Sequence, residues 1–398
     1  MCQLKRQNTL LHNATNKNLV SPFLNVVCGI AILLVFVLIL AGCAPKKRPL
    51  RASIQAVQNT QIQESQPNQD FTDYEDDKNF KRGKKGTFKV ALLIPKQLVG
   101  RYSVNISNTI LAYLIARGID YEFEMFDSID ESPRNLKTYY GRISDFHLVI
   151  AILSQQGVEN LIDSVRISYP TYVPTINKER ITKSTPRNLY FGGISYKEQF
   201  EMLLPLMQDS TQNSKIVEYG DDSQIGLYLT NLFNSYNLRP ARQRIINNQD
   251  ASNFTKMLPQ EAPYFAGANL ILNTSASKSG LLLSQIRYST RAPKQFLSTQ
   301  VNFNPTILQL STPQSRRNFF VVNAISQSDA KLNEYATLLN SDLQYDWVSY
   351  ATCIGVEFGL SLYERGFKRY FEEQLQSNQV QYKNRIFTTN ESAFIPAQ

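Results

Sequence analysis

The sequence has 398 residues but very little cysteine and histidine, with four of the first and two of the second. Three of the cysteines lie in the first 43 residues, and the fourth is Cys353. A single remaining thiol cannot form an internal disulfide, so the fold must depend on its apolar core. The histidines are His12 and His147. With so few ligands and bases, zinc sites and histidine-dependent catalytic triads are nearly excluded.

The two isolated side chains have structural explanations. Cys353 lies in an apolar pattern with helical spacing, where a buried, inert cysteine is expected. His147 lies in the apolar run Phe146–Ile150, which is typical of a strand. We therefore expect the imidazole to be satisfied by local hydrogen bonds.

The motifs of phosphate-binding and acylating enzymes are also missing. No Gly-x-x-x-x-Gly-Lys-Ser/Thr loop occurs, and Gly83–Thr87 resembles one only superficially. Ser275 and Lys278 match the Ser-x-x-Lys pattern, but its companions Ser-Asp-Asn and Lys-Thr-Gly are absent. Ser275 is better explained as a helix N-cap. Asp221-Asp222 could bind a cation or form a hydrolase dyad, although a loop or capping role fits better. We predict no catalytic residue, no metal and no cofactor.

The chain is mildly basic. Lys and Arg number 42 against 33 Asp and Glu, which gives a formal net charge of +9. Such a surface could favour anionic lipids or polymers. No basic stripe with interleaved aromatic residues occurs outside the polar segment near the N-terminus, so nucleic acid is not expected as a partner.

The first 42 residues have the layout of an export signal. Lys5, Arg6 and Lys17 precede an apolar run from Val26 to Gly42, and no acidic residue lies before it. A positive segment followed by an apolar segment is the pattern of a secretory signal. The run is at the short end of what spans a bilayer, so an uncleaved signal-anchor helix is the alternative.

The end of this run, Leu40-Ala41-Gly42-Cys43, resembles the lipobox of bacterial lipoprotein signal peptides. In that family the signal is cut before the cysteine, which carries acyl chains such as palmitate. The resemblance implies that Cys43 is lipidated and starts the mature chain. Two or more acyl chains hold a protein durably on a membrane. The residue that follows Cys43 is Ala44 and not Asp. By resemblance to enteric sorting rules, this favours an outer-membrane anchor that faces the periplasm.

Residues 43–87 are predicted to be a disordered tether. From Ala44 onward the composition is poor in apolar residues and rich in Gln, Asn, Asp, Lys and Pro. Such a segment cannot bury enough surface to order itself.

From Phe88 onward, apolar strand patterns alternate with amphipathic helix patterns. Phe88–Pro95 is typical of a buried parallel strand, and helical spacing between Ser103 and Arg117 ends at Gly118. Repeated βα units imply parallel sheets covered on both faces. The pattern restarts near residue 196, so we predict an α/β fold of two doubly wound parallel-sheet lobes joined by a multi-crossing hinge. Further strands are predicted over 121–126, 147–153, 172–176, 189–194, 215–219, 242–247, 269–273, 295–299, 318–325 and 382–387. Further helices are predicted over 158–167, 223–236, 277–288, 329–339 and 347–371, together with one that begins at residue 132, one that ends at residue 207 and a short one near residue 254.

An ordered series of these segments resembles type I periplasmic-binding-protein folds. Lys89–Pro95 with Gly100-Arg101-Tyr102 is most similar to the opening of outer-membrane lipoproteins that activate penicillin-binding proteins. Gly280–Arg287 with Ala292–Thr299 is similar to the second-lobe helix and crossover strand of branched-chain amino-acid receptors. The resemblance extends over about residues 88 to 390 and includes Val217–Asp222, with its Tyr-Gly pair, and the aromatic-rich Tyr345–Tyr363.

The resemblance implies two lobes with a ligand cleft between them. We assign residues 88–195 to lobe 1, 196–300 to lobe 2, and 301–398 to the remainder of lobe 1 and a return to lobe 2. The chain is expected to cross between the lobes near Ser195, near Gln300, and around Ile325 to Asp342.

Open α/β sheets bind ligands at the carboxyl ends of their strands. The loops at these positions supply the candidate cleft residues, which are Arg101, Tyr102, Ser154, Gln155, Thr175, Asn177, Tyr219, Asp221, Asn273, Thr274 and Thr299. The amino-acid receptors have a Gly-Pro-Leu-Ser-like loop after the third strand, whereas this chain has Ala151–Gln156 without Gly-Pro. The amino-acid signature is thus degraded.

Two functions remain open at this stage. The first is a non-enzymatic binding or regulatory lipoprotein that contacts periplasmic proteins, with cell-wall synthases as the implied partner. The second is a solute receptor that delivers an amino acid or similar small molecule to an ABC transporter. Both have the membrane as a partner through Cys43, and an enzyme is a distant third reading.

Overall fold

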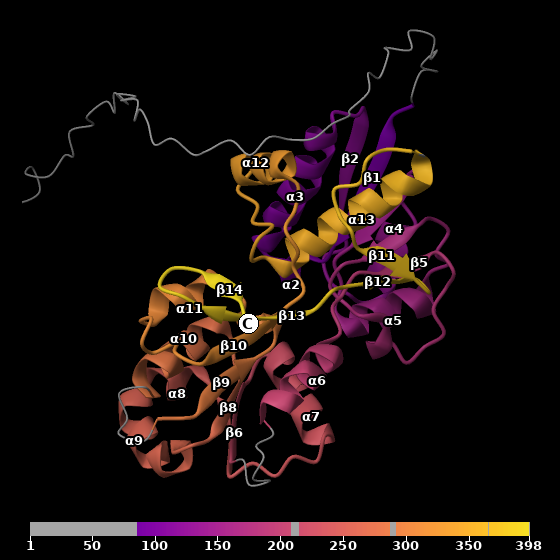
Figure 1. Cartoon of the computed structure of the whole chain (residues 1–398). Coiled ribbons are helices and arrows are strands. Elements are labelled where there is room, and N and C mark those ends of the chain that lie inside the picture. The colour runs from indigo at the N-terminus through magenta and orange to yellow at the C-terminus, as the bar shows by residue number, and fades with distance from the viewer. Residues whose placement is uncertain (1–85, 208–214, 287–291, 365, 398) are drawn as a thin grey trace, which may run out of the picture. The chain divides into compact units, whose positions relative to one another are not determined.

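The computed structural model describes residues 86–207, 215–286, 292–364 and 366–397 (Figure 1). The predicted signal peptide, Cys43 and the predicted tether up to residue 85 lie outside these residues. In the described part of the chain, each helix is too short or too polar to cross a membrane.

Two sheets form the framework, and each is built mainly from parallel strands. The strand order of the first is β11-β12-β5-β4-β3-β1-β2, and that of the second is β14-β13-β10-β9-β8-β6-β7. The first sheet contains β1 (Phe88–Ile94), β2 (Tyr121–Asp127), β3 (Leu148–Ala151), β4 (Thr171–Val173), β5 (Leu189–Phe191), β11 (Gln374–Gln376) and β12 (Gln379–Gln381). The second contains β6 (Ile216–Asp221), β7 (Arg242–Ile246), β8 (Asn269–Asn273), β9 (Gln295–Ser298), β10 (Phe319–Asn323), β13 (Arg385–Thr389) and β14 (Phe394–Pro396).

Helices cover both faces of each sheet because successive strand residues point to opposite sides. In β1, Val90 and Leu92 pack with one group of helices, and Ala91 and Leu93 pack with another. The helices of lobe 1 are α2 (Lys96–Val99), α3 (Tyr102–Arg117), α4 (Pro133–Tyr140), α5 (Gln155–Ser164), the 3₁₀ turn η1 (Lys178–Arg180), α12 (Ala330–Leu338) and α13 (Trp347–Tyr363). Those of lobe 2 are α6 (Tyr196–Met207), α7 (Gln224–Ser235), α8 (Asn248–Ser252), α9 (Phe254–Phe265), α10 (Ala276–Ile286), the 3₁₀ turn η2 (Gln300–Asn302) and α11 (Pro305–Leu310).

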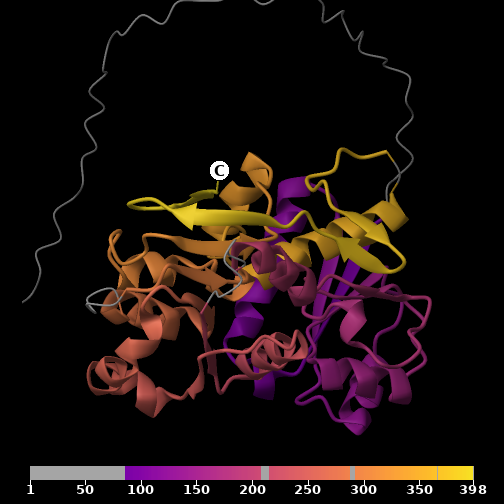
Figure 2. The same ribbon diagram turned by 60° about the horizontal axis from the view of Figure 1, so that its bottom comes forward.

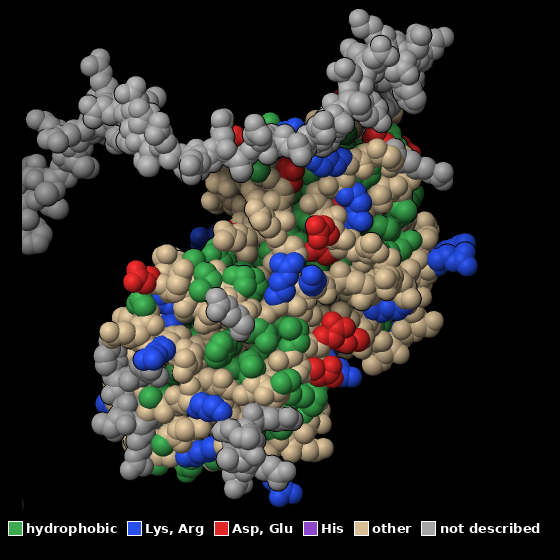
Figure 3. All heavy atoms as spheres, in the orientation of Figure 1, with side chains coloured by type: hydrophobic (Ala, Val, Ile, Leu, Met, Phe, Trp, Pro, Cys, Tyr) green, Lys and Arg blue, Asp and Glu red, His purple; other side chains and the backbone are tan. Residues whose placement is uncertain are grey.

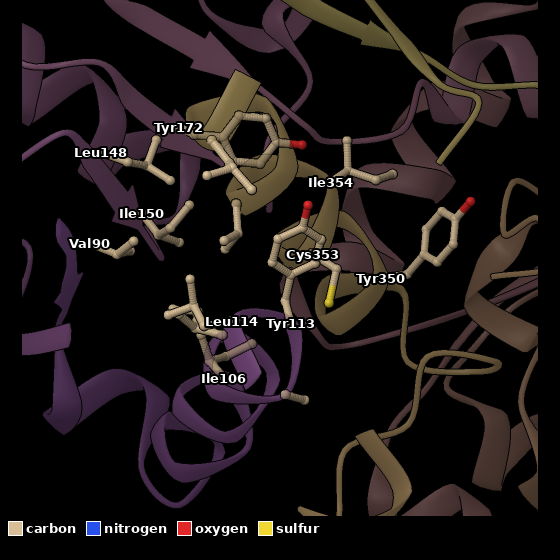
Figure 4. Close-up of a cluster of buried hydrophobic side chains, with 14 of the residues drawn as sticks. Val90, Ile106, Tyr113, Leu114, Leu148, Ile150, Tyr172, Tyr350, Cys353 and Ile354 are labelled. Atoms are coloured by element: carbon tan, nitrogen blue, oxygen red, sulfur yellow. The ribbon is translucent and has the colours of Figure 1, made fainter. Parts of the chain in front are cut away.

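The core of lobe 1 places the late helix α13 beside the early helix α3. Tyr113 and Leu114 from α3 meet Cys353 and Ile354 from α13 in one buried cluster (Figure 4). Cys353 is a fully buried free thiol, and burial raises its pKa above the ordinary value. This confirms the prediction that Cys353 is a buried core residue.

His147 is satisfied locally, as predicted. Its Nδ1 accepts a hydrogen bond of 3.0 Å from the backbone N–H of Lys89. Its ring packs against Tyr363, with centroids 4.4 Å apart. Burial lowers the pKa of His147, which favours the neutral imidazole that this hydrogen bond requires.

The chain crosses between the lobes three times, and one crossing predicted from the sequence is wrong. The described crossings follow β5 near Ser195, follow β10 at residues 324–329, and follow β12 at residues 382–384. No crossing occurs near Gln300, because β9 and β10 on either side of it are adjacent in the second sheet. Figure 2 shows the last crossing as the C-terminal segment that passes from one sheet to the other.

Three other predictions need correction. The helix predicted to reach residue 371 ends at Tyr363, and the backbone N–H groups of Tyr370 and Phe371 instead donate to the buried carboxylate of Glu357. The short helix near Phe254 is a twelve-residue helix, α9, despite Pro259 and Pro263 inside it. The sequence also gave no sign of β11, β12 or β14, which are three residues long.

Candidate ligand-binding site

Most of the candidate cleft residues lie at the carboxyl ends of strands or in the loops that follow them, whereas Tyr102 begins the helix α3 and Tyr219 lies in the middle of β6. Those of lobe 1 follow β1, β3 and β4, and those of lobe 2 lie on or after β6, β8 and β9. Most of their polar groups are bound within their own lobe.

Tyr102 is the first residue of α3 and is joined to the start of α13. Its hydroxyl donates to the carboxylate of Asp346, at 2.6 Å from Oδ1 and 2.7 Å from Oδ2. Burial and the carboxylate charge raise the pKa of Tyr102. Asp346 also caps α13, so this contact fixes the two helices together. The neighbouring Arg101 is exposed.

The loop after β3 is anchored by Glu131. The backbone N–H of Ser154 donates to Glu131 Oε1 at 2.6 Å, and its hydroxyl donates to Oε2. The same hydroxyl accepts from the N–H of Gly157 at 3.1 Å and caps α5. Gln155 exchanges two hydrogen bonds with Arg180, one with its carbonyl at 2.8 Å and one with its guanidinium at 3.2 Å.

The loop after β4 is also closed on itself. The Thr175 hydroxyl donates to the carbonyl of Leu153 at 2.6 Å. Asn177 is buried and donates to the carbonyl of Gly193 at 3.0 Å, which holds this loop against the first crossing. Gly193 permits that approach, because a Cβ there would lie 2.2 Å from the backbone of Ile176.

In lobe 2, Asp221 and Asp222 have separate structural roles. Asp221 is buried and accepts from the backbone N–H groups of Ser223 and Ser275, at 3.0 and 2.6 Å. Asp222 is paired with the Lys278 ammonium at 2.9 Å, and that ammonium also donates to a backbone carbonyl. The geometry fits the loop-and-capping interpretation of the acidic pair and gives the Ser-x-x-Lys match a structural explanation. Among the described residues, no group of His, Cys, Asp and Glu could hold a metal ion.

Tyr219 points into the interior of lobe 2. It is fully buried on β6, and its hydroxyl donates to Glu261 on α9 at 2.9 Å. Glu261 also pairs with Arg242 and Arg244 of β7. Tyr219 is thus part of a β6–β7–α9 network.

One of the remaining lobe 2 candidates, Asn273, binds a buried carboxyl group that was not identified from the sequence. Asn273 Nδ2 donates to Glu218 Oε1 at 3.0 Å, and Thr230 donates to the same atom at 2.9 Å. Burial raises the pKa of Glu218. Thr274 shares a hydrogen bond with Ser279 at 2.6 Å. Among the buried side-chain atoms of the described residues, Glu218 Oε2, Asn273 Oδ1 and Thr299 Oγ1 have no partner.

The sequence also gave no sign of a contact that joins the two lobes. The guanidinium of Arg180, from η1, lies 4.2 Å from the ring centroid of Tyr228, from α7. Tyr228 also contacts Tyr196 at the start of α6, with centroids 6.2 Å apart. Since Arg180 is held by Gln155, this stack connects a candidate cleft residue of lobe 1 to lobe 2. The charge of Lys178-Glu179-Arg180 was visible in the sequence, but its partner in a distant helix was not.

The crossings themselves are bound by buried amide side chains. Gln199 Nε2 donates to Asn384 Oδ1 at 3.0 Å, and Gln199 Oε1 accepts from the N–H of Gln300 at 2.9 Å. Gln300 in turn donates to Asn323 Oδ1 at 3.0 Å and accepts from the N–H of Ala324 at 2.7 Å. We call Gln199, Gln300, Asn323 and Asn384 the hinge amide chain, since it joins the second and third crossings.

The similarity to known proteins lies in the structure and not in the sequence. Neither a protein-family model nor a curated protein sequence matches the chain. Solved structures do match. The substrate-binding protein LivJ of a Streptococcus pneumoniae branched-chain amino acid transporter, in complex with isoleucine, has a TM-score of 0.52 and 14% identity, over 78% of this chain and 100% of LivJ. A Thermus thermophilus branched-chain amino acid ABC transporter protein with bound valine has a TM-score of 0.54 and 14% identity, over 79% of this chain and 96% of that one.

A different kind of protein shares the fold as well. LpoA from Haemophilus influenzae has a TM-score of 0.50 and 12% identity, over 79% of this chain and 59% of its own. The present chain therefore spans little more than half of LpoA. Together with the two sheets and three crossings, these similarities show that the chain has the fold of type I periplasmic binding proteins.

Proposed function

We propose that this protein is a membrane-anchored periplasmic lipoprotein that acts as a non-enzymatic binding and regulatory module. Lipidated Cys43 would anchor it in the outer membrane, and residues 43–87 would tether the two lobes. Its partners would be cell-envelope proteins such as peptidoglycan synthases. The lobe assignments made from the sequence stay part of this proposal, with the first part of lobe 2 extended from residue 300 to residue 323 and a crossing added at residues 382–384.

The observation that carries the proposal is the state of the strand-end loops. Four candidate residues make their hydrogen bonds within their own lobe, namely Ser154, Thr175, Asn177 and Asp221. A solute receptor needs convergent polar groups that are free for its ligand. Loops stabilised in this way fit a scaffold that presents its outer surface to a partner. The described residues that resembled catalytic motifs have structural partners, which supports a non-enzymatic role.

A solute receptor for an amino acid or similar small molecule, feeding an ABC transporter, is the second candidate. Two buried groups of lobe 2 favour it, since Asn273 Oδ1 and Thr299 Oγ1 have no partner among the described residues. Unpartnered buried acceptors of this kind are costly unless a ligand or water satisfies them. The fold is also shared by proteins solved with isoleucine and valine.

One experiment separates the two candidates. The full chain, purified in detergent, is immobilised and titrated with purified peptidoglycan synthases, and in parallel its thermal unfolding is followed with a library of amino acids and other metabolites. Saturable synthase binding with no metabolite response supports the regulatory function. A metabolite at 100 times its Kd would add about 2.7 kcal/mol to the free energy of unfolding. Such a response that is lost in Thr299→Val, without synthase binding, would overturn the proposal in favour of the receptor.

The membrane anchor has its own test. Cells that express the full chain are fed an alkyne analogue of palmitate, and the labelled protein is followed through membrane fractionation. Label and membrane association are expected in the wild type and should both be absent in Cys43→Ser. A Cys43→Ser protein that stays on the membrane would indicate an uncleaved signal-anchor helix.

A further inference from the structure

A cavity lies away from the candidate cleft residues. It has a volume of about 730 Å³, within the range of small-molecule sites, and none of the candidate cleft residues lines it. Its walls are the second crossing, the end of α12 with the loop that leads to α13, and the strands β13 and β14. We call it the junction pocket because both lobes contribute to it.

One wall of the junction pocket is aromatic. Phe303, Tyr345 and Phe394 line it and contact one another, with ring centroids 4.6 to 6.0 Å apart. The backbone of Tyr345 is fixed, because its N–H donates to Asp342 Oδ1 at 2.9 Å. Preformed aromatic surfaces of this kind suit the flat, apolar face of a ring.

The remaining walls are rich in amides and hydroxyls. The lining includes Gln327, Asn333, Asn340 and Ser326, with one cation, Arg385. Asn333 is bound to Ser328, whose hydroxyl donates to it at 2.6 Å. The exposed side chains of Gln327, Asn340 and Arg385 make no hydrogen bond with other described residues and are therefore free for a ligand.

The aromatic wall and the polar walls together indicate which chemical class of ligand fits the pocket. A purely apolar ligand would bury the free amides without a partner, which is costly. A multiply charged anion would find one lining cation, Arg385, and also one lining carboxylate, Asp342. On the face shown in Figure 3, charged side chains of both signs are likewise interspersed. A ligand with flat C–H faces and a rim of hydroxyl or amide groups matches both walls.

We propose that the junction pocket binds a short saccharide, with a sugar ring stacked on the aromatic wall and its rim bonded to Gln327, Asn340 and Arg385. The saccharide would touch α12, which packs on α3 in lobe 1, and β13 and β14, which belong to the second sheet. It would therefore stabilise this arrangement of the lobes over any arrangement in which the pocket is open. None of the residues that line the pocket is a candidate cleft residue, so saccharide binding can be tested apart from the synthase contact and from any ligand at the strand ends.

The test uses the full chain in a detergent without a sugar headgroup, because such a headgroup would compete for the pocket. Thermal unfolding and calorimetric titration are carried out with N,N′-diacetylchitobiose and with cellobiose. We expect a saturable rise of roughly 5 °C in the unfolding midpoint with at least one of them. A response to the first alone identifies an amino-sugar ligand, and a response to the second alone identifies a neutral glucan.

Variants connect the response to the pocket. Gln327→Ala changes an exposed side chain, so it should leave the fold intact and lower the affinity about tenfold. Tyr345→Ala removes part of the aromatic wall and should abolish binding. Tyr264→Ala on α9 is the matched control, because Tyr264 is 38% exposed and does not line the pocket. No response to either disaccharide, or a response unchanged in Gln327→Ala and Tyr345→Ala, would overturn the proposal.

Discussion

At the scale of single residues, Glu218 stands out because it is a buried acid whose partners are all neutral. Its Oε1 accepts from Asn273 and Thr230, and its Oε2 has no partner among the described residues. Burial raises its pKa above the ordinary 4.5. A proton on the carboxyl group would remove the cost of burying its charge.

This environment predicts a specific pH dependence. The folded state binds the Glu218 proton more tightly than the unfolded state, so the stability that this proton contributes is complete below about pH 4.5 and is lost as the pH rises through the raised pKa. Glu218→Gln mimics the neutral acid and should gain stability relative to the wild type as the pH rises. Urea unfolding between pH 4 and pH 8 measures the difference. The exposed Glu334→Gln is the control, and parallel curves for Glu218→Gln and wild type would refute the expectation.

At the scale of elements, the helices and central strands were readily predicted from the sequence. β1 and β8 are short apolar runs buried along their whole length or nearly so, and Ser132, Ser223 and Asp329 cap the helices that follow them. Periodicity and capping are local signals. The strands that were missed have no such signal, because β11 and β14 are short, partly exposed and paired only through the C-terminal segment.

The positions of most candidate site residues could be predicted from the sequence, but their hydrogen-bond partners could not. Parallel strands place their carboxyl ends at one edge, so the loops could be named from the sequence. What those loops bind could not, because Ser154 meets Glu131 and Asn177 meets Gly193 through the fold. The prediction of a crossing near Gln300 was wrong for a similar reason. A buried amide in a loop looks like a hinge residue, whereas here it joins neighbouring strands to α6.

Gln300 provides the test at this scale. Gln300→Ala leaves the buried N–H of Ala324 without its partner and removes one of the two hydrogen bonds that Asn323 Oδ1 accepts, which should cost about 1–3 kcal/mol of the free energy of unfolding. Urea unfolding measures the loss, and hydrogen exchange of residues 323–325 should become faster. Gln314→Ala, at an exposed position in the same lobe, is the control and should change the stability little. Unchanged exchange in Gln300→Ala would mean that the hinge amide chain does not restrain the second crossing.

At the scale of the whole folded unit, the stack of Arg180 on Tyr228 joins the lobes, in addition to the crossings and to the contacts of Tyr345 with Phe303 and Phe394. Tyr228→Ala removes it. We expect a cost of about 0.5–1 kcal/mol and a larger radius of gyration in small-angle scattering of the full chain, because the lobes can separate further. Tyr264→Ala removes a comparable stack with Lys215 and Arg242 inside lobe 2, so it should leave the scattering profile unchanged. Identical profiles for both variants would show that the stack does not hold the lobes together.

The segment that makes the third crossing has a consequence for how the protein is made. It gives the first sheet the edge strand β11 and its neighbour β12, and it gives the second sheet the edge strand β14 and its neighbour β13. During synthesis, therefore, neither lobe can be completed until residues after Gln374 have left the ribosome. Contacts between residues so distant in the sequence form slowly. The last step of folding must therefore wait for this C-terminal segment, which adds its strands to both sheets at nearly the same moment.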